Sequence, residues 1–369
     1  GAESVIDTCG AGPLEHCMSG NLLDLCPAGA LHEPGELFRA PAWRMTGVSS
    51  TCAGCASGCV TRIDVADGRV QRVKPRSDGE DGQGYWLCDA GRWGWQEQSE
   101  RLTGPQVRGN VVEWDAAFAE VAEHMEQART GAVLMSPYLS NEEAFLLGNL
   151  ALRWEADLYL WQATAAAGDQ SFPSGFTISA ERGPNCAGVQ AVAKVLGLPL
   201  LDSSELSRRH AKGDIDALFA VGGSLHAEAP ELIVPDESFL VVLDVQSPVW
   251  VHDAHVLLAG CSAWVEKEGT FIDRKGRLQR VRSAVLPPGE ARPDFWILAA
   301  LWHGGPNRDS PEQAFSRLAG SASEGPFAQL DYGALDSQHA AEGVAFGGGW
   351  TSLLQRRGLI RVEDHSKRR

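Results

Sequence analysis

Four cysteines near the amino end of the chain have the residue type and spacing of a metal-cluster site. Cys52, Cys55 and Cys59 lie within eight residues, and Cys88 follows after a further 28 residues. Thiolate sulfur is the soft ligand of iron–sulfur clusters, and four thiolates complete the coordination of a cubane. Glycines lie between the first three cysteines, where the backbone must turn tightly and bring its N–H groups near sulfur. The motif therefore predicts a [4Fe-4S] cluster.

A structural zinc site is the main alternative for four cysteines. Such sites usually pair their ligands as two CxxC knuckles, whereas Cys88 stands alone. Buried or disulfide-bonded cysteines are a second alternative. The nine cysteines of the chain are clustered, however, which suits a reducing compartment better than a disulfide framework. We expect the iron–sulfur site and keep zinc as the competing interpretation.

Cys26 is a further candidate metal ligand. It directly precedes Pro27, and a Cys-Pro step typically ends a ferredoxin-type cluster motif. The other three ligands normally form a CxxCxxC group, and Cys9 and Cys17 match no such spacing. The alternative is a small buried apolar residue before a proline-containing turn. Both interpretations of Cys26 stay open.

Several stretches resemble the large iron–sulfur subunit of NADH-quinone oxidoreductase, respiratory complex I. This subunit, the 75 kDa subunit in mitochondria, joins a ferredoxin-like cluster region to a domain shared with molybdopterin oxidoreductases. The stretches are SGNLLDLCPAGAL (19–31), FRAPAWRM (38–45), TCAGCASGC (51–59), WLCDAGRWGW (86–95), SPYLSNEEAFLL (136–147) and the segment 254–302. The four-cysteine motif is common to the wider molybdopterin oxidoreductase superfamily, but its combination with the first stretch is more specific to complex I.

The resemblance implies an electron-transfer subunit with no catalytic residue of its own. Cys52, Cys55, Cys59 and Cys88 match an additional [4Fe-4S] site of some bacterial members, and Cys26 matches the last ligand of a second [4Fe-4S] cluster. No molybdopterin is expected. The resemblance also implies that the chain is truncated at its start and ends early. The expected partners are other subunits of the peripheral arm, at the cytoplasmic, inner face of the plasma membrane.

Composition limits the possible partners. The formal net charge of −16 argues against nucleic acid, because phosphate binding requires a basic surface. No apolar run approaches the roughly 18 residues of a membrane span, and no secretory signal is visible. We therefore expect membrane contact only through partner subunits.

A β-hairpin is expected to return Cys88 to the other cysteines. Two runs, 60–65 and 69–74, flank the tripeptide Ala66-Asp67-Gly68, and Asp-Gly between such runs is a strong hairpin signal. The first 44 residues then form the end of a ferredoxin-like region. Residues 45–103 form a small, cysteine-rich β domain around the cluster.

Residues 104–305 are expected to form a doubly wound, mostly parallel α/β domain of the molybdopterin-oxidoreductase type. Short, wholly apolar strands alternate there with helical patterns, which is typical of a parallel sheet covered on both faces. The expected strands are 132–135, 157–161, 217–221, 239–243 and 255–258, and the expected helices are 114–127, 140–154, 185–196 and 294–302. Segment 266–281 is expected to be a solvated hairpin edge guarded by charge. Residues 306–369 are expected to be a C-terminal extension with one short helix, 311–318, and surface wrapping elsewhere.

Two other functions compete with the electron-transfer subunit. One is a molybdopterin-dependent, formate dehydrogenase-like oxidoreductase fragment, and the other is a zinc-stabilised scaffold subunit. Molybdopterin enzymes usually carry Lys or Arg two residues after the last cluster cysteine, but that position is Ala90 here. They also need a metal ligand in the α/β domain, where Cys186 and Cys261 are the only cysteines. The strand 217–221 is followed by Gly222-Gly223-Ser224, which is no complete dinucleotide fingerprint.

Overall fold

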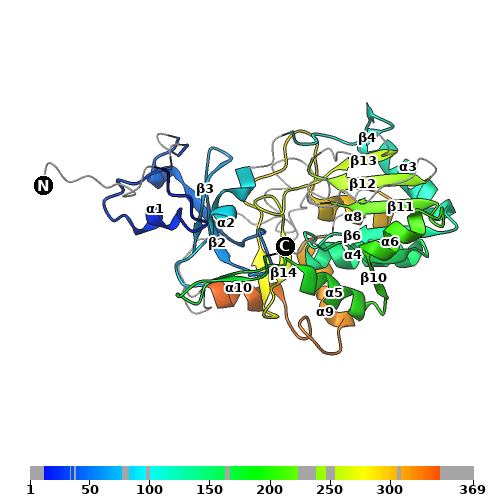
Figure 1. Cartoon of the computed structure of the whole chain (residues 1–369). Helices are drawn as coiled ribbons and strands as arrows, with labels where there is room; N and C mark the ends of the chain where they lie inside the picture. Colours follow the sequence, from blue (N-terminus) through cyan, green and yellow to red (C-terminus); the bar gives the residue numbers. More distant parts are fainter. Residues whose placement is uncertain are drawn as a thin grey trace, which may run out of the picture.

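The computed structural model describes residues 12–33, 35–36, 39–76, 83–96, 100–162, 167–222, 238–246, 254–305 and 309–340. It is a mixed α/β fold with a small β sheet near the amino end and a larger, mostly parallel sheet behind it (Figure 1). In the described part of the chain, no helix has both the length and the apolar character needed to cross a membrane.

The small sheet is antiparallel and carries the predicted hairpin. Its strands, in the order β1-β2-β3, are β1 (Thr46–Thr51), β2 (Val60–Ala66) and β3 (Arg69–Pro75). Asp67 and Gly68 form the turn with φ angles of 52° and 73°, the left-handed conformation that a two-residue hairpin loop requires. Buried Asp64 pairs with Arg62 and Arg72 on the same face and fixes the register. The hairpin prediction is confirmed.

The large sheet has the order β10-β7-β6-β11-β12-β13-β4-β5. Its first six strands are parallel, and β4 and β5 extend it antiparallel at one edge. The strands are β4 (Gln106–Val107), β5 (Asn110–Val111), β6 (Gly131–Met135), β7 (Asp157–Leu160), β10 (Leu200–Asp202), β11 (Ala217–Val221), β12 (Phe239–Asp244) and β13 (Val256–Ala259). From β6 the chain adds β7 and β10 on one side and then β11, β12 and β13 on the other. This reversal between β6 and β11 is the arrangement of doubly wound folds.

Side-chain alternation along the central strands explains why both faces of this sheet are covered. Val133 packs into one core and its neighbour Leu134 into the other, as a two-residue period requires. Helices α3, α4, α5, α8 and α9 cover the first face, and α6 covers the second. They span α3 (Trp114–Gln127), α4 (Asn141–Arg153), α5 (Cys186–Val195), α6 (Ser203–His210), α8 (Asp294–His303) and α9 (Pro311–Ser321). The doubly wound prediction is confirmed.

Four short elements and two small hairpins complete the fold. The short helices near the amino end are α1 (Asn21–Leu25), η1 (Ala42–Arg44), α2 (Asp89–Trp93) and η2 (Gly94–Gln96). The hairpins are β8 (Gln170–Ser171) with β9 (Thr177–Ile178), and β14 (Gly269–Ile272) with β15 (Leu278–Val281). In Figure 1, β14 lies between the small sheet and the large one.

The expectation of a solvated edge at 266–281 is wrong. Every residue of β14 is buried, and β15 is buried except for its first residue. The charges of this segment bind each other inside the protein, for example Arg280 to Glu268 at 2.8 Å. On the small-domain side, Thr51 donates a hydrogen bond to the Arg280 carbonyl and Gln279 donates one to the Gly58 carbonyl. The hairpin therefore joins the two sheets.

The residues after 304 are more ordered than the expected surface wrapping. Helix α9 runs three residues beyond the predicted end, and Phe315 and Leu318 are fully buried in the main core. Helix α10 (Tyr332–Ala340) follows, with the Arg280 guanidinium 3.4 Å from the centroid of the Tyr332 ring. The Tyr332 hydroxyl donates a hydrogen bond to buried Glu142 at 2.9 Å. The part of the extension predicted for 341–369 lies outside the described residues.

Candidate iron–sulfur site and sheet crevice

The structure brings the four predicted cysteines together in one buried group. Cys52, Cys55 and Cys59 lie on the loop between β1 and β2, and Cys88 is the residue before α2. Each is 6–7% exposed. The Cys52 amide donates to the Cys59 carbonyl at 2.8 Å, which closes the loop on itself. Apolar side chains such as Leu87 and Val265 surround the group.

Backbone N–H groups point at the sulfur atoms. Gly54 donates to Cys52 Sγ at 3.3 Å and Gly91 donates to Cys88 Sγ at 3.4 Å. A methyl group on Gly91 would lie 3.2 Å from Cys52 Sγ and 2.8 Å from Leu87. Glycine is therefore required for close approach of the backbone to sulfur, and such donors stabilise the negative charge of a ligated thiolate.

The electrostatics of the group require a cationic guest. Burial is the largest factor that raises the pKa of Cys52 and Cys59 well above the usual thiol value, and the neighbouring cysteines raise it further. Burial likewise raises the pKa of Cys88 to about 11. Four buried thiolates repel one another unless positive charge lies among them, and a coordinating metal supplies that charge and removes the protons. The four residues therefore fit an iron–sulfur cluster.

The spacing of the sulfur atoms argues against a single zinc ion. A zinc–sulfur bond is about 2.3 Å, so the sulfurs of a tetrahedral zinc site lie roughly 3.8 Å apart. Among the described residues, only Glu143, Cys261 and Asp294 form a group of three or more ligating side chains whose atoms all lie within 4.8 Å. The four cysteines are all described and are not drawn together to that extent. Their wider spacing suits a cubane, whose corner iron atoms each take one thiolate.

Cys26 lies outside this group. It follows α1, and the Ala30 amide donates to its sulfur at 3.3 Å. Backbone N–H groups of Ala30 and Leu31 lower the Cys26 pKa, so the turn after Pro27 favours a thiolate. This donor geometry suits a metal ligand better than a buried apolar residue, and Cys26 is in fact partly exposed.

A fifth cysteine that the sequence spacing did not single out lies against the site. Cys17 packs beside the buried group, and its carbonyl accepts a hydrogen bond from the Asp89 amide at 2.7 Å. No sequence signal could have placed it, because 72 residues separate it from Asp89.

The segment that precedes Cys26 is anchored to the segment that carries Cys88. Asn21 exchanges two hydrogen bonds with the Leu87 backbone, at 2.9 and 3.0 Å. The Asp89 carboxylate accepts from Ser19 Oγ and from the Gly20 amide. Arg92 is 4% exposed and pairs with Asp24. The basic residue nearest the last cluster cysteine therefore faces α1 instead of the large sheet.

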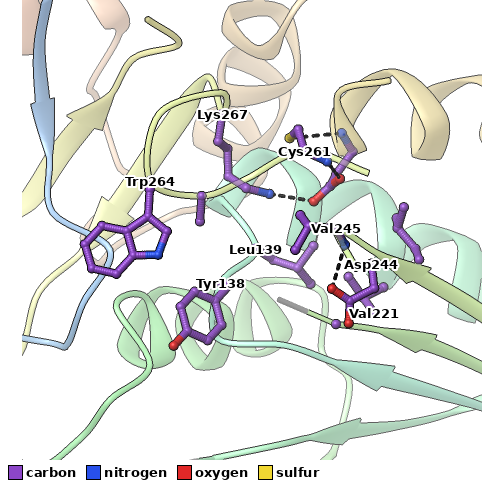
Figure 2. Close-up of a pocket in the computed structure, with 12 residues that line it drawn as sticks. Tyr138, Leu139, Val221, Asp244, Val245, Cys261, Trp264 and Lys267 are labelled. Carbon is purple, nitrogen blue, oxygen red and sulfur yellow. Dashed lines mark hydrogen bonds and ion pairs between the residues drawn. The ribbon is translucent and has the colours of Figure 1, made fainter. Parts of the chain in front are cut away.

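A second site lies at the carboxyl ends of the central strands, where doubly wound folds bind their ligands. The cavity there has a volume of about 40 Å³ (Figure 2). Its wall comprises Tyr138, Leu139, Val221, Gly222, Leu243, Asp244, Val245, Cys261, Ala263, Trp264, Lys267 and Asp294. Small-molecule pockets are usually about 300–1,000 Å³, so the described walls leave no room for a dinucleotide-sized cofactor. They do not fit a molybdopterin.

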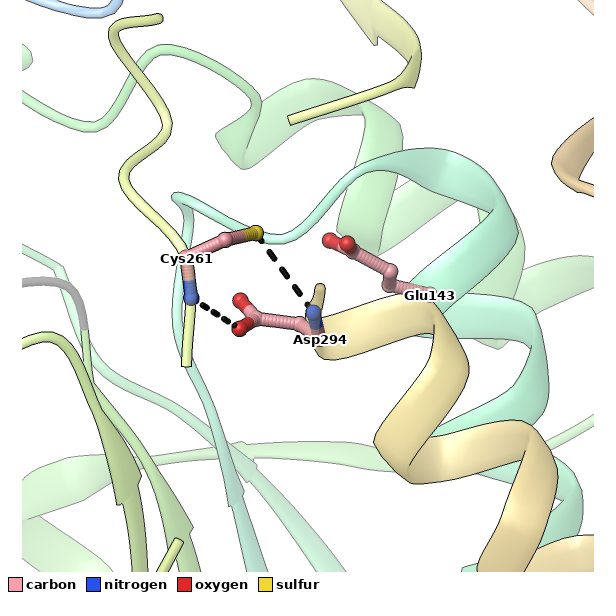
Figure 3. A group of neighbouring side chains, drawn as sticks. All are labelled: Glu143, Cys261 and Asp294. Carbon is pink, nitrogen blue, oxygen red and sulfur yellow. Dashed lines mark hydrogen bonds between the residues drawn. The ribbon is translucent and has the colours of Figure 1, made fainter. Parts of the chain in front are cut away.

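An ion triad occupies the polar side of this cavity. Glu143, Cys261 and Asp294 approach one another as metal ligands would (Figure 3). Lys267, however, places its ammonium 2.6 Å from Glu143 and 2.7 Å from Asp294. Lys267 is 2% exposed, and the two carboxylates raise its pKa, so it stays charged. A lysine cation therefore takes the place that a metal ion would need.

Cys186, the other cysteine considered as a molybdenum ligand, does not face this cavity. It begins α5, and the Gln162 amide donates to its sulfur at 2.8 Å. Burial raises its pKa to about 11. Cys186 is therefore a neutral thiol in a packed position.

Comparison with protein families places two domain types on this chain. Residues 45–99 match the molybdopterin oxidoreductase Fe4S4 domain, which contains all four cysteines of the buried group. Residues 170–303 match the molybdopterin oxidoreductase family. The first match supports a [4Fe-4S] cluster in this part of the chain.

Curated relatives include respiratory and ferric-reducing enzymes. The chain is 37% identical over 165 residues to NADH-quinone oxidoreductase subunit 3 of Thermus thermophilus, covering 42% of this chain and 21% of the relative. It is 33% identical to an NADH-quinone oxidoreductase subunit of Streptomyces coelicolor, covering 41% and 19%. It is also 33% identical to the NADPH-Fe(3+) oxidoreductase subunit alpha of Geobacter sulfurreducens, covering 41% and 18%. The aligned part thus spans about a fifth of each relative, and the resemblance to the complex I iron–sulfur subunit is confirmed.

Proposed function

We propose that this chain is an electron-transfer iron–sulfur subunit of a proton-pumping NADH:quinone oxidoreductase and passes electrons from NADH toward quinone. The observation that carries the proposal is the buried, glycine-lined quartet of cysteines inside a matched Fe4S4 domain. Relatives named as subunits of NADH-quinone oxidoreductase support the assembly. The chain would act within that complex and carry no complete catalytic site alone.

Cys52, Cys55, Cys59 and Cys88 are the proposed ligands of the [4Fe-4S] cluster. A bound cluster supplies one-electron transfer. The chain's own residues hold four thiolates in fixed positions, donate N–H groups to sulfur and exclude water. Cys26 is proposed as one ligand of a second [4Fe-4S] cluster, supported by the backbone donors around its sulfur. The other ligands of that cluster are not among the described residues near Cys26.

The proposed partners are other subunits of the peripheral arm of complex I, at the inner face of the plasma membrane. Relatives named as subunits of a multi-subunit oxidoreductase support this assembly. Within the chain, we propose domain boundaries after residues 44, 103 and 305. The 104–305 domain would serve mainly as a scaffold.

A molybdopterin-dependent oxidoreductase is the second candidate function, because residues 170–303 match that family. We propose that this chain binds no pterin. The small volume of the crevice and the Lys267 ion triad support this view. A zinc-stabilised scaffold is the third candidate, and the spacing of the four cysteines argues against it.

Metal analysis of anaerobically purified protein tests these candidates together. We expect about four irons and four acid-labile sulfides per chain, no stoichiometric molybdenum or zinc, and a visible absorption that dithionite bleaches. Stoichiometric zinc without iron would overturn the cluster. Extractable molybdopterin would replace the complex I proposal with the second candidate.

A further inference from the structure

A second cavity, of about 80 Å³, lies beside the cluster-binding loop. Three elements form it: the loop that carries Cys59, the β8–β9 hairpin and the turn between β14 and β15. The lining residues are Ser57, Cys59, Gln83, Gly175, Phe176, Thr177, Arg274, Lys275 and Arg277. A water molecule takes roughly 30 Å³ in the liquid, so the cavity has room for two or three waters or one small oxyanion.

The charge of the lining is of one sign. Arg274, Lys275 and Arg277 contribute three cations, and none of the described residues in the wall carries a carboxylate. This local charge is opposite to the formal −16 of the whole chain. Planar guanidinium groups with several donors are well suited to bind oxyanions.

Carboxylates outside the wall hold two of these cations in place. Asp169 binds Arg274 at 2.6 Å, and Asp273 binds Arg277 at 2.7 Å. Asp273 is fully buried and also accepts the backbone amides of Lys275 and Arg277. Gly276 completes the turn with a φ of 79°. The cations are thus positioned by the fold, which reduces the entropy cost of binding a ligand.

The cavity shares a wall with the cluster site. Cys59 belongs to both, and the Arg277 guanidinium is close enough to lower the Cys59 pKa against the effect of burial. A negative charge placed in the cavity would therefore act on the cluster over a short distance through a weakly polar interior.

We propose that this cavity binds a small oxyanion, and that anion binding is linked to the redox state of the cluster at Cys52, Cys55, Cys59 and Cys88. The inference rests on the proposed cluster. Reduction adds one electron to the cluster, so the reduced cluster repels a bound anion more strongly than the oxidised cluster does. Linkage is reciprocal: the anion binds more tightly to the oxidised protein, and it makes the cluster harder to reduce.

A redox titration with sulfate as the probe tests the proposal. The midpoint potential of the holo protein is measured as potassium sulfate replaces potassium chloride at constant ionic strength. We expect the potential to fall and then to saturate, with an affinity for sulfate about 5- to 150-fold higher in the oxidised state, the usual range of such couplings. Calorimetric titration of the oxidised protein with sulfate should give one site per chain.

Paired variants identify the site. Arg274→Gln with Lys275→Gln should abolish the sulfate dependence and the calorimetric binding. Arg208→Gln with Lys212→Gln removes the same charge from the α6 region and should leave both unchanged. Iron content is measured on each protein. Absence of iron contradicts the proposed function, whereas a full cluster whose potential ignores sulfate, or responds equally in both variants, overturns only the anion site.

Discussion

Burial determines what the four cysteines can do. A free thiol at an exposed position exchanges its proton readily, but the pKa values of Cys52 and Cys59 are raised far above neutral by burial and by neighbouring sulfur. Without metal these residues are neutral thiols. With iron they are thiolates, since metal coordination outcompetes the proton. Cluster insertion therefore releases protons and assembles the site in the same step.

Cys55→Ser tests the cluster ligands. We expect the variant to lose most of its iron and visible absorption, because a serine hydroxyl is a poor ligand for iron at this position. Inductively coupled plasma analysis and dithionite-bleachable absorption measure the effect. Cys17→Ser is the matched control, since Cys17 packs beside the site without belonging to it, and it should keep full iron. Full iron in the Cys55 variant would contradict the assignment.

Glu143→Gln tests the buried ion triad through pH. Burial raises the Glu143 pKa from 4.5 to about 7, with Lys267 opposing the shift. Between these values the folded protein binds a proton that the unfolded chain has released. This group's contribution to stability is therefore fully present below pH 4.5 and is lost as pH rises to about 7, by up to about 3 kcal/mol.

The measurement is denaturant unfolding of both proteins at several pH values. The stability of the parent relative to the Glu143→Gln variant should decline as pH rises toward 7 and then level off. Glu126→Gln, which removes a carboxylate that is 45% exposed, should show no such trend. A constant difference between the parent and the Glu143 variant would show that this carboxyl has no raised pKa.

The ligand cysteines could be predicted from the sequence, because the motif is local and sulfur is chemically distinctive. The Lys267 triad could not. Its three members lie 124 and 27 residues apart along the chain, and no spacing rule connects them. Cys17 was missed for the same reason. Long-range placement depends on the packing of the whole fold.

At the scale of elements, the β2–β3 hairpin connects the first three cysteines to Cys88. The Asp-Gly turn was readable because left-handed backbone angles strongly favour these residues. The buried strands of the large sheet and most of its helices were readable from periodicity. The β14–β15 hairpin was misjudged because its charges are paired with partners from distant segments, which sequence alone does not reveal.

Gly68→Ala tests the hairpin turn. Alanine at a φ of 73° should cost about 1 kcal/mol of stability, although no atom lies near enough to clash. Gly320→Ala, in α9, provides a control of opposite sign, because alanine is favoured over glycine inside a helix and its site is also open. Chemical unfolding of both variants measures the effect. A stabilised Gly68 variant would be inconsistent with the turn described.

At the scale of the molecule, the two sheets form one body through the β14–β15 hairpin. One strand of this hairpin contacts the small sheet, and the other contacts helices α4 and α5 of the large domain. Helix α10 packs on β15 and adds the Arg280–Tyr332 contact. The cluster region therefore shares its support with the large domain.

Removing the cluster should lower the melting temperature of the whole body, because a ligand that binds only the folded state stabilises that state. Calorimetry of the holo protein and of protein treated anaerobically with a chelator measures the effect. We expect the main transition to shift downward. A main transition that stays in place while a separate small one moves would show that the two sheets unfold independently.

The contact between Gln279 and Gly58 has a consequence for the order of events during synthesis. These residues are 221 positions apart, so the ribosome completes the cysteine loop long before it makes the hairpin that closes over it. At 5–20 residues per second the interval is about 10 to 45 s. During that time the nascent thiols lack their outer wall. Iron delivery in the cell therefore has an early period of open access that ends once translation reaches β15.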